Sequence, residues 1–259
     1  MSTGILAFMD NNDIRRAQHL ERLERRRQVM NERLEKHRER INERFDKKQA
    51  KLSGKMTIKQ EQIIAAALEL LDEKGLSNLS LRDIAKALNM QAPALYWYFK
   101  NKEDLVDYMA EAILQKEFHD LQERRDDQSW QDWLIQHMTQ LRRAMLAYTD
   151  GARVVAGAHI YPTVTLAKSF EYSMSSLTSA GIDLPTSRHI VATATHYTFG
   201  HVIEEQSSPN EEQLANIDVD DLLDNYPHIA EITRHLDRSP ETATKEFIIG
   251  IGYIIKGSS

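Results

Sequence analysis

From residue 56 onward, apolar side chains recur every three or four positions, which is the period of an amphipathic α-helix. Thr57 opens the first of these runs, and Gln60 three residues later completes a capping-box pattern. Gly75 follows the last apolar position and predicts a left-handed C-cap. The apolar face of this helix consists of Ile63, Ile64, Ala67, Leu68 and Leu71.

The same spacing predicts further helices, separated by short turns such as Thr149-Asp150-Gly151 and Ala180-Gly181. No run alternates apolar and polar residues over the length of a strand, so we expect an all-α fold. Residues 206–218 are rich in Ser, Pro, Asn and acids, and we expect them to form a mobile loop. The further helices are predicted at 81–88, 92–99, 102–120, 129–148, 163–180, 184–206, 219–236 and 240–256.

Residues 12–52 carry mostly charged side chains and contain no Pro or Gly, which predicts one long charged helix. Ser53-Gly54 ends the pattern, so we divide the chain at 1–55, 56–102 and 103–259. Three interpretations of the extension stay open: a solvated helix or weak coiled coil, a basic arm along DNA, and a partner-binding helix. Its apolar residues fall near heptad positions, at Leu20, Leu23, Met30, Leu34 and Ile41, while Arg27, His37, Arg44 and Lys48 fill other core positions of that register.

Composition narrows the class of protein. Residues 1–55 hold 15 Lys and Arg against 9 Asp and Glu, whereas residues 56–259 hold 18 against 30, so a basic arm precedes an acidic body. The absence of cysteine excludes disulfides and thiolate metal sites and fits a reducing cytoplasm. No apolar run approaches the length of a membrane span, and the N-terminus lacks the features of a signal peptide, so we expect no membrane association.

Residues 80–99 have the pattern of a helix-turn-helix. Ser80 with Asp83 forms a second capping-box pattern, and Asn89 lies in the turn, where a left-handed backbone is often needed. Pro93 occupies the first turn of the next helix, where its missing N–H costs nothing. Leu95 and Phe99 are predicted to face inward and to leave Ala94, Trp97 and Tyr98 projecting outward. The buried stripe of the first helix is Leu81, Ile84, Ala85 and Leu88.

These residues carry a family resemblance. The strings Leu81-Arg82-Asp83-Ile84-Ala85-Lys86-Ala87-Leu88 and Pro93-Ala94-Leu95-Tyr96-Trp97-Tyr98-Phe99-Lys100-Asn101-Lys102 resemble the DNA-binding domain of the TetR family. The likeness extends over about residues 56–257, through Ser129-Trp130-Gln131-Asp132, Asp150-Gly151-Ala152 and Val202-Ile203-Glu204. It implies a three-helix DNA-binding domain followed by a helical ligand-binding and dimerisation domain.

The resemblance also implies a set of DNA contacts. Arg82 would reach a guanine edge or a phosphate, Gln91 an adenine, and Pro93 with Ala94 the methyl groups of thymine. The aromatic residues would lie on the sugar–phosphate backbone, and Lys102 would hold a phosphate. Asn89 replaces a turn glycine, and Ala92 and Ala94 replace polar base-reading residues, so we expect a distinct operator. The implied DNA-binding residues are Ser80, Arg82, Gln91, Ala92, Pro93, Ala94, Tyr96, Trp97, Tyr98 and Lys102.

An effector pocket is implied in the same way. Tetracycline-responsive members of the family bind the drug as a magnesium chelate through His, Asn, His, Thr and Glu side chains. The matching positions here are Phe118, His137, Val155, Ala158 and Glu204, of which only Glu204 is retained. We therefore expect a small-molecule effector other than tetracycline–magnesium, with no metal and no cofactor, although His159 is a possible substitute ligand. The implied effector-binding residues are Phe118, His137, Leu141, Val155, His159, Tyr172, His196, Phe199 and Glu204.

The resemblance implies a homodimeric repressor in the bacterial cytoplasm, located on the nucleoid when bound to DNA. A two-fold dimer predicts a palindromic double-stranded operator with half-sites about one helical turn apart. The alternative function is an architectural or partner-binding DNA-associated protein without an effector. An enzyme is disfavoured because His201 and Glu205 form a helical pair that lacks a third convergent group. The expected dimer surface contains Thr193, Ala194, Phe199, Gly200, Phe247, Ile248, Gly250, Ile251, Gly252, Ile254 and Ile255, with an intramolecular core as its alternative.

Overall fold

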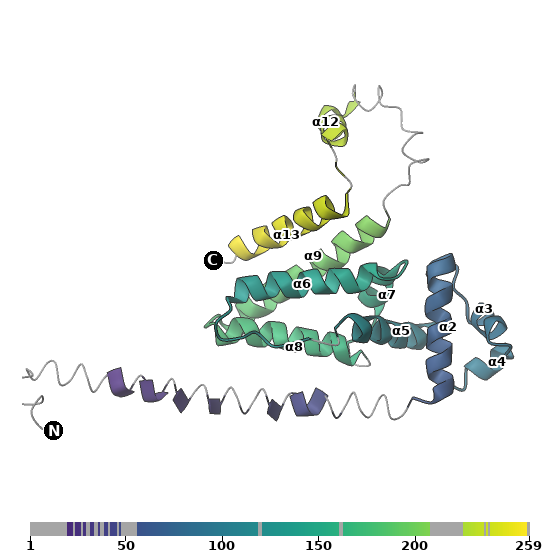
Figure 1. Cartoon of the computed structure of the whole chain (residues 1–259), viewed down its shortest axis with the longest axis horizontal. Helices are drawn as coiled ribbons and strands as arrows, with labels where there is room; N and C mark the ends of the chain where they lie inside the picture. Colours follow the sequence, from purple (N-terminus) through teal and green to yellow (C-terminus); the bar gives the residue numbers. More distant parts are fainter. Residues whose placement is uncertain are drawn as a thin grey trace, which may run out of the picture. The chain divides into compact units, whose positions relative to one another are not determined.

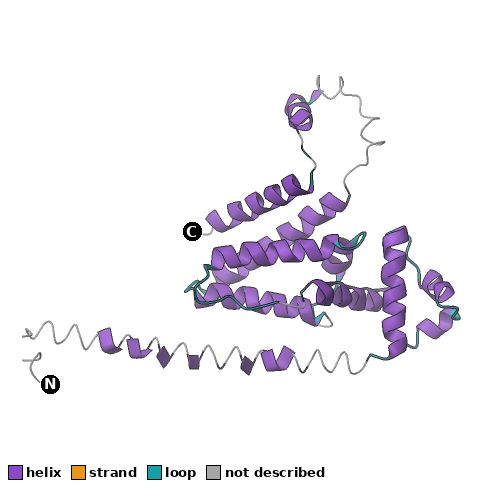
Figure 2. Ribbon diagram, viewed as in Figure 1, coloured by secondary structure: helices purple, strands orange, loops and turns teal. Residues whose placement is uncertain are grey.

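The computed structural model describes residues 56–118, 121–160, 163–207, 225–235, 237 and 239–257, and scattered positions between 20 and 47. The chain divides into two compact units, residues 1–54 and 55–259. Every regular element among these described residues is a helix, so the all-α prediction is confirmed (Figure 2). The described positions of the first unit are all helical and lie at 20–22, 24–26, 28–29, 32–33, 36, 39–40, 42–45 and 47.

Three helices form the start of the second unit: α2 (Ile58–Lys74), α3 (Leu81–Ala87) and α4 (Ala92–Leu95) (Figure 1). The Thr57–Gln60 capping box is present in both directions, as predicted. Asn89 has φ of 53°, the left-handed backbone that the turn needs. Gly75 has positive φ but ψ of 166°, so the predicted left-handed cap is wrong; its N–H still bonds the Leu71 carbonyl.

The second helix of the motif is shorter than the predicted 92–99. After Leu95 the backbone tightens, and the N–H of Tyr98 donates to the Leu95 carbonyl at 2.9 Å. Such three-residue hydrogen bonds are typical of a helix terminus. Four consecutive aromatic residues follow Leu95, and aromatic side chains have lower helix propensity than straight-chain ones, so the periodic pattern overestimated the length.

Five helices follow, namely α5 (Lys102–Glu117), α6 (Trp130–Leu146), α7 (Gly151–Gly157), α8 (Val164–Ser179) and α9 (Leu184–Gln206). Sequence periodicity did not predict α7, because a helix of seven residues is too short to show a repeat. The predicted end of the helix at 102–120 is also wrong: α5 stops at Glu117. Figure 1 shows α6 and α8 side by side with α5 and α7 between them and α2.

The chain ends in α12 (Pro227–His235) and α13 (Pro240–Lys256). Phe247, Ile251 and Ile255 are buried within the chain, and Ala194 of α9 is buried too, so these members of the expected dimer surface belong to the intramolecular core. A side chain at Gly250 would collide with Tyr197 of α9, so its close approach is also internal. The predicted loop at 206–218 and the segment 219–224 lie almost wholly outside the described residues.

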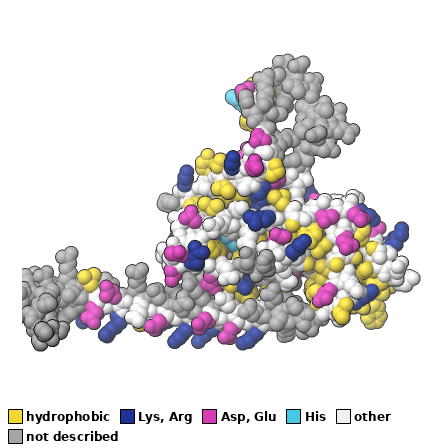
Figure 3. All heavy atoms as spheres, in the orientation of Figure 1, with side chains coloured by type: hydrophobic (Ala, Val, Ile, Leu, Met, Phe, Trp, Pro, Cys, Tyr) yellow, Lys and Arg dark blue, Asp and Glu magenta, His cyan; other side chains and the backbone are white. Residues whose placement is uncertain are grey.

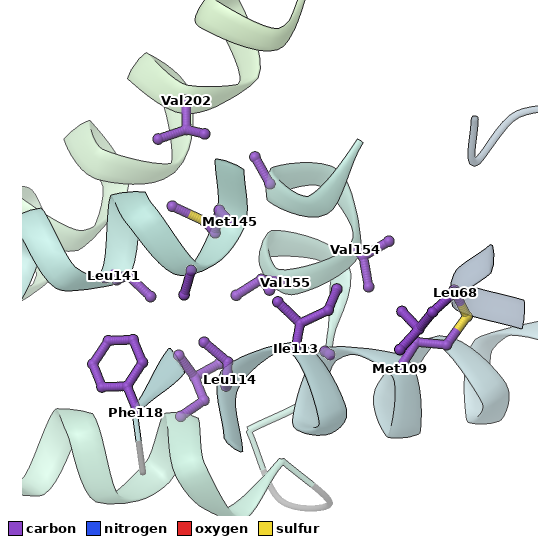
Figure 4. Close-up of a cluster of buried hydrophobic side chains, with 14 of the residues drawn as sticks. Leu68, Met109, Ile113, Leu114, Phe118, Leu141, Met145, Val154, Val155 and Val202 are labelled. Carbon is purple, nitrogen blue, oxygen red and sulfur yellow. The ribbon is translucent and has the colours of Figure 1, made fainter. Parts of the chain in front are cut away.

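One apolar core joins α2, α3 and α4 to the other helices of the second unit. Figure 4 shows Leu68 of α2 beside Met109 of α5, and Ile113 beside Val155 of α7. All of these side chains are at most 8% exposed. Close packing of this kind transmits displacements between helices, because a packed core deforms little. No helix in the described part of the chain is long and apolar enough to cross a membrane.

Candidate DNA interface and effector site

A short segment, Ala92–Phe99, is buried at two positions and exposed or partly exposed at the others. Leu95 and Phe99 are 0% and 1% exposed, and the Phe99 ring meets Tyr108 of α5 edge-on at 5.4 Å between centroids. Tyr96 is 58% exposed and Trp97 is 88% exposed. A tryptophan side chain that is so highly exposed contributes little to the stability of the fold, and large exposed apolar side chains commonly serve in binding.

The remaining side chains of the segment extend this surface. Gln91 and Pro93 are exposed, whereas Ala92, Ala94 and Tyr98 are partly buried. The inward and outward positions thus agree with the sequence pattern, except that Ala94 and Tyr98 are only partly exposed. The side-chain amide of Gln60 donates to the Tyr98 carbonyl at 3.5 Å and ties the start of α2 to the segment. The segment is therefore held as a rigid, mostly outward-facing element.

Helix α3 contributes Arg82, whose side chain is exposed beside the N-cap. Ser80 itself is committed to capping: its hydroxyl accepts from the Asp83 N–H at 3.2 Å and donates to the Asp83 carboxylate at 2.5 Å. The Ser80 hydroxyl also lowers the pKa of Asp83, aided by Lys74 at 3.4 Å. Arg82 is free to reach a ligand, whereas the Ser80 hydroxyl positions the helix.

Lysines at the start of α5 have two different environments. The Lys102 ammonium donates to the Leu76 carbonyl at 3.0 Å and so stabilises the loop after α2. Lys100, which the sequence argument did not select, is exposed. Asn101 caps α5 by accepting from the Asp104 N–H at 2.7 Å. The only sequence signal that could have pointed to Lys100 is that lysine side chains commonly bond phosphate.

Five of the nine candidate effector residues are buried in the larger helical region. His137 stacks on Trp133 at 4.6 Å, meets Phe118 edge-on at 5.6 Å, and shares a 2.7 Å hydrogen bond with the Ser169 hydroxyl. Burial lowers the pKa of His137 to about 4, so the imidazole is neutral at pH 7. The five buried residues are Phe118, His137, Leu141, Val155 and Tyr172.

A cavity of about 280 Å³ opens against His137 and Trp133 at the N-terminal half of α6. Amide side chains are prominent in its wall, and the Gln128 amide donates to Gln136 at 2.8 Å across it. Amides both donate and accept hydrogen bonds, so the wall suits a neutral polar ligand. This wall could not be predicted from the sequence, because glutamines that lie apart along the chain form no motif. The lining comprises Leu121, Gln122, Glu123, Arg125, Gln128, Trp133, Gln136, His137 and Gln140.

Of the nine candidate effector residues, only His137 lines this cavity. The His159 side chain is 71% exposed, and its Nδ1 lies 3.1 Å from the Asp107 carboxylate. His196 and Glu204 of α9 are exposed, and Phe199 is partly buried. Within the single chain these residues do not line the cavity around His137.

Two buried acids of α5 hold the segment between α7 and α8. Asp107 accepts from the His159 N–H at 2.7 Å, and Glu111 accepts from the Thr165 N–H and hydroxyl, both at 2.9 Å. Asp107 and Glu111 are four residues apart and therefore share one face of α5. A displacement of the α7–α8 connection would thus act directly on α5.

A polar junction links the end of α2 to the turn before α7. The Leu76 N–H donates to Asp150 Oδ2 at 2.8 Å, and the Thr149 N–H donates to Asp72 Oδ1 at 2.7 Å. Asp150 adopts φ of 54° and carries this carboxylate to Gly75, where an added Cβ would lie 2.9 Å from it. The DNA-binding helices are therefore docked on the sensing helices by two carboxylates.

Glu205, beside the candidate Glu204, belongs to an ion pair between α6, α9 and α13. Arg142, 7% exposed, donates from Nε to Glu205 Oε2 at 2.9 Å and from Nη1 to the Thr244 hydroxyl at 3.2 Å. Because its carboxylate binds Arg142, Glu205 is not available to hold a metal together with His201. Burial lowers the pKa of His201. Among the described residues, no three His, Cys, Asp or Glu side chains form a metal-binding group.

Comparisons with known proteins match both the helix-turn-helix region and the helical region that follows it. Residues 63–109 match the family of bacterial regulatory proteins, tetR family, and residues 124–258 match the tetracyclin repressor-like C-terminal domain. The chain is 37% identical over 151 residues to the tetracycline repressor protein class C of Escherichia coli, covering 58% of this chain and 68% of that protein.

Two solved structures are similar over most of the chain. A TetR variant from Acinetobacter baumannii AYE in complex with minocycline is 30% identical, with a TM-score of 0.57, over 75% of this chain and 93% of that one. BioQ with its natural double-stranded DNA operator is 28% identical, with a TM-score of 0.51, over 64% and 98%. The chain belongs to the tetR family and is a ligand-responsive transcriptional regulator that binds operator DNA.

Proposed function

We propose that this regulator is a homodimeric repressor that holds a palindromic operator through Ala92–Phe99 and leaves it when a neutral organic effector enters the cavity beside His137. The observation that carries the DNA-reading role is the exposure of Trp97 and Tyr96 on a segment anchored by buried Leu95 and Phe99. The proposed base and phosphate contacts are Arg82, Gln91, Ala92, Pro93, Ala94, Tyr96, Trp97 and Tyr98, with Ser80 and Lys102 positioning the motif.

The operator is proposed to be read by two copies of the motif. Ile249 and Tyr253 of α13 are 54% and 70% exposed, on the side of the helix away from buried Ile251. This apolar surface supports pairing of two chains through α13 and its neighbour α9. We assign no catalytic function to the chain, and we place its action on chromosomal DNA in the bacterial cytoplasm.

Effector release is proposed to act through α5. A ligand in the cavity would act on the His137 ring, which meets Phe118 at the end of α5, and the Asp107 and Glu111 contacts would join a displacement of α5 to the α7–α8 connection. The Asp150 junction fixes α2 to the same body, so movement of α5 would reorient the recognition segment. Release requires only that the effector bind the non-DNA-binding arrangement more tightly.

The chain does not fit a tetracycline–magnesium chelate. Val155 is fully buried and has no ligand atom, Ala158 also has none, and the His159 ring lies against Asp107. Hard cations such as magnesium require oxygen ligands, and neither position supplies one. The glutamine-rich wall instead supports a neutral hydrogen-bonding molecule as effector.

A thermal-shift experiment tests this assignment. Tetracycline with magnesium should leave Tm unchanged within about 1 °C, whereas a true effector at one hundred times its Kd should add about 2.7 kcal/mol of stability. A library screen should yield neutral compounds that raise Tm and release bound DNA in a gel-shift assay. A magnesium-dependent rise with tetracycline, or stabilising ligands that all leave DNA binding intact, would contradict the proposal.

Trp97→Ala should weaken binding to a duplex selected from a random pool by about tenfold, equivalent to about 1.4 kcal/mol. The side chain is 88% exposed, so Tm should not change. Fluorescence anisotropy and thermal unfolding measure the two effects. Tyr226→Ala, which removes a 55% exposed aromatic residue elsewhere, should leave DNA affinity intact. Equal affinity of Trp97→Ala and the parent protein would argue against the assigned interface.

Asp150→Asn should loosen the junction between the DNA-binding and sensing helices. Asparagine tolerates the φ of 54° and keeps an oxygen that accepts from the Leu76 N–H, but the charge that strengthens this bond is lost, at a cost of about 1 kcal/mol. The Leu76 amide should then exchange with deuterium several-fold faster. Asp127→Asn, which removes an exposed carboxylate paired with Arg125, should leave this amide unaffected. Unchanged exchange at Leu76 would show that the junction does not depend on Asp150.

A further inference from the structure

Seven of the eight described basic side chains of the N-terminal unit fall on one face of its helix, and the eighth, Arg25, lies among the acidic residues. With about 100° of rotation per residue, the seven occupy an arc of roughly 80°. Their spacing of three, four and seven residues keeps them aligned over the whole described segment. The members of this set, called the basic stripe below, are Arg22, Arg26, Arg33, Lys36, Arg40, Arg44 and Lys47.

Acidic side chains are sorted onto the neighbouring face. Glu21, Glu24, Glu32, Glu39 and Glu43 fall within an adjacent arc of roughly 100°. In the described part of this unit, Arg25 pairs with Glu21 at 4.0 Å and Lys47 pairs with Glu43 at 3.3 Å. The side chains of both pairs are highly exposed. Exposed pairs of this kind contribute little to stability. Sorting of charge by face is therefore not explained by pairing within the helix.

The stripe is accessible to a partner. All seven of its members are exposed, and Figure 3 shows basic side chains recurring along the N-terminal segment. Leu20 and Phe45 project from a different face of the helix, whereas the exposed Val29 lies among the stripe residues. An exposed row of cations favours a partner with a matching row of anions.

We propose that the basic stripe binds the phosphate backbone of double-stranded DNA outside the base pairs read by the helix-turn-helix. A regular helix of the length from Arg22 to Lys47 would rise roughly 38 Å, and DNA presents one negative charge per roughly 1.7 Å of its axis. Five of the seven members are arginine, whose planar guanidinium suits phosphate oxygens. The body of the chain, with 30 acids against 18 bases, repels DNA, and the stripe offsets that repulsion.

The inference rests on the DNA-binding function, and its test uses the full chain with a 60-base-pair duplex of random sequence. The variant Arg26→Gln, Arg33→Gln and Arg40→Gln removes three stripe charges while keeping good helix formers. Because each phosphate contact contributes about 0.9 to the salt dependence, the slope of log K against log salt should fall by up to roughly 2.7. Circular dichroism should show unchanged helicity.

A matched control removes three exposed charges from the body: Arg143→Gln, Arg153→Gln and Arg188→Gln. Its slope should stay close to that of the parent protein, and deletion of residues 1–54 should lower the slope at least as much as the stripe variant. An unchanged slope in the stripe variant or in the deletion overturns the inference, as does an equal fall in the body control. If the parent protein selects an operator sequence but the salt slope of the stripe variant is unchanged, this inference alone is overturned. If the parent protein shows no sequence preference, the proposed function is overturned.

Discussion

Arg142→Met should lower the free energy of unfolding by about 3–5 kcal/mol. This is the largest effect that we expect of any single replacement. Arg142 is 7% exposed and bonds both Glu205 and Thr244, so its removal leaves a carboxylate without its partner between α6, α9 and α13. The guanidinium also lies 5.7 Å from the centre of the Phe247 ring. Urea unfolding followed by circular dichroism measures the loss.

The adjacent Arg143 supplies the control. It lies on the same helix but is exposed, so Arg143→Met should change the free energy of unfolding by no more than about 0.5 kcal/mol. Replacing both partners, with Arg142→Met and Glu205→Leu, should recover much of the loss because no charge is then left unpaired. If Arg142→Met and Arg143→Met are equally stable, the ion pair does not hold α9 and α13 to α6.

The second large effect is a loss of stability in acid that depends on His137. Its pKa is lowered by burial to about 4, whereas an unfolded histidine takes up its proton near 6.5. Between these values the unfolded chain binds more protons than the native chain, so stability falls as pH falls from 6.5 to 4. The contribution of this group is about 3 kcal/mol and is fully present above pH 6.5.

Comparison of variants isolates this contribution. His137→Phe cannot take up a proton and should flatten the fall in unfolding free energy between pH 6.5 and 4, measured by urea titration at each pH. His196→Gln, which changes an exposed histidine of α9, should keep the fall of the parent protein. A parent-like acid profile in His137→Phe would show that His137 is not the buried neutral group that the packing indicates.

Local sequence rules were sufficient where capping residues and apolar spacing coincide. Thr57 and Ser80 cap their helices as predicted, and Asn89 adopts the left-handed backbone. Helix α7 escaped prediction because its seven residues carry no repeat, and the α4 terminus was misjudged where aromatic side chains follow it. Short-range patterns therefore locate long helices well and short ones poorly.

The candidate sites show a different limit. Spacing along α4 correctly separated buried Leu95 and Phe99 from exposed Trp97, because one helix turn decides that choice. The cavity beside His137 joins glutamines of α6 to the loop before it, and the dimer prediction mistook Phe247 and Ile251 for surface. An apolar helix face looks the same in sequence whether it meets its own chain or another, so only packing distinguishes the two.

Selection of bound DNA from a random pool tests the central claim most directly. Two copies of Ala92–Phe99 presented by a symmetric dimer should enrich a palindrome whose half-sites lie about 10 base pairs apart from centre to centre. Trp97→Ala should enrich it weakly or not at all, while Tyr226→Ala should return the same sequence. Recovery of no preferred duplex by the parent protein, in the absence of any small molecule, would contradict the account.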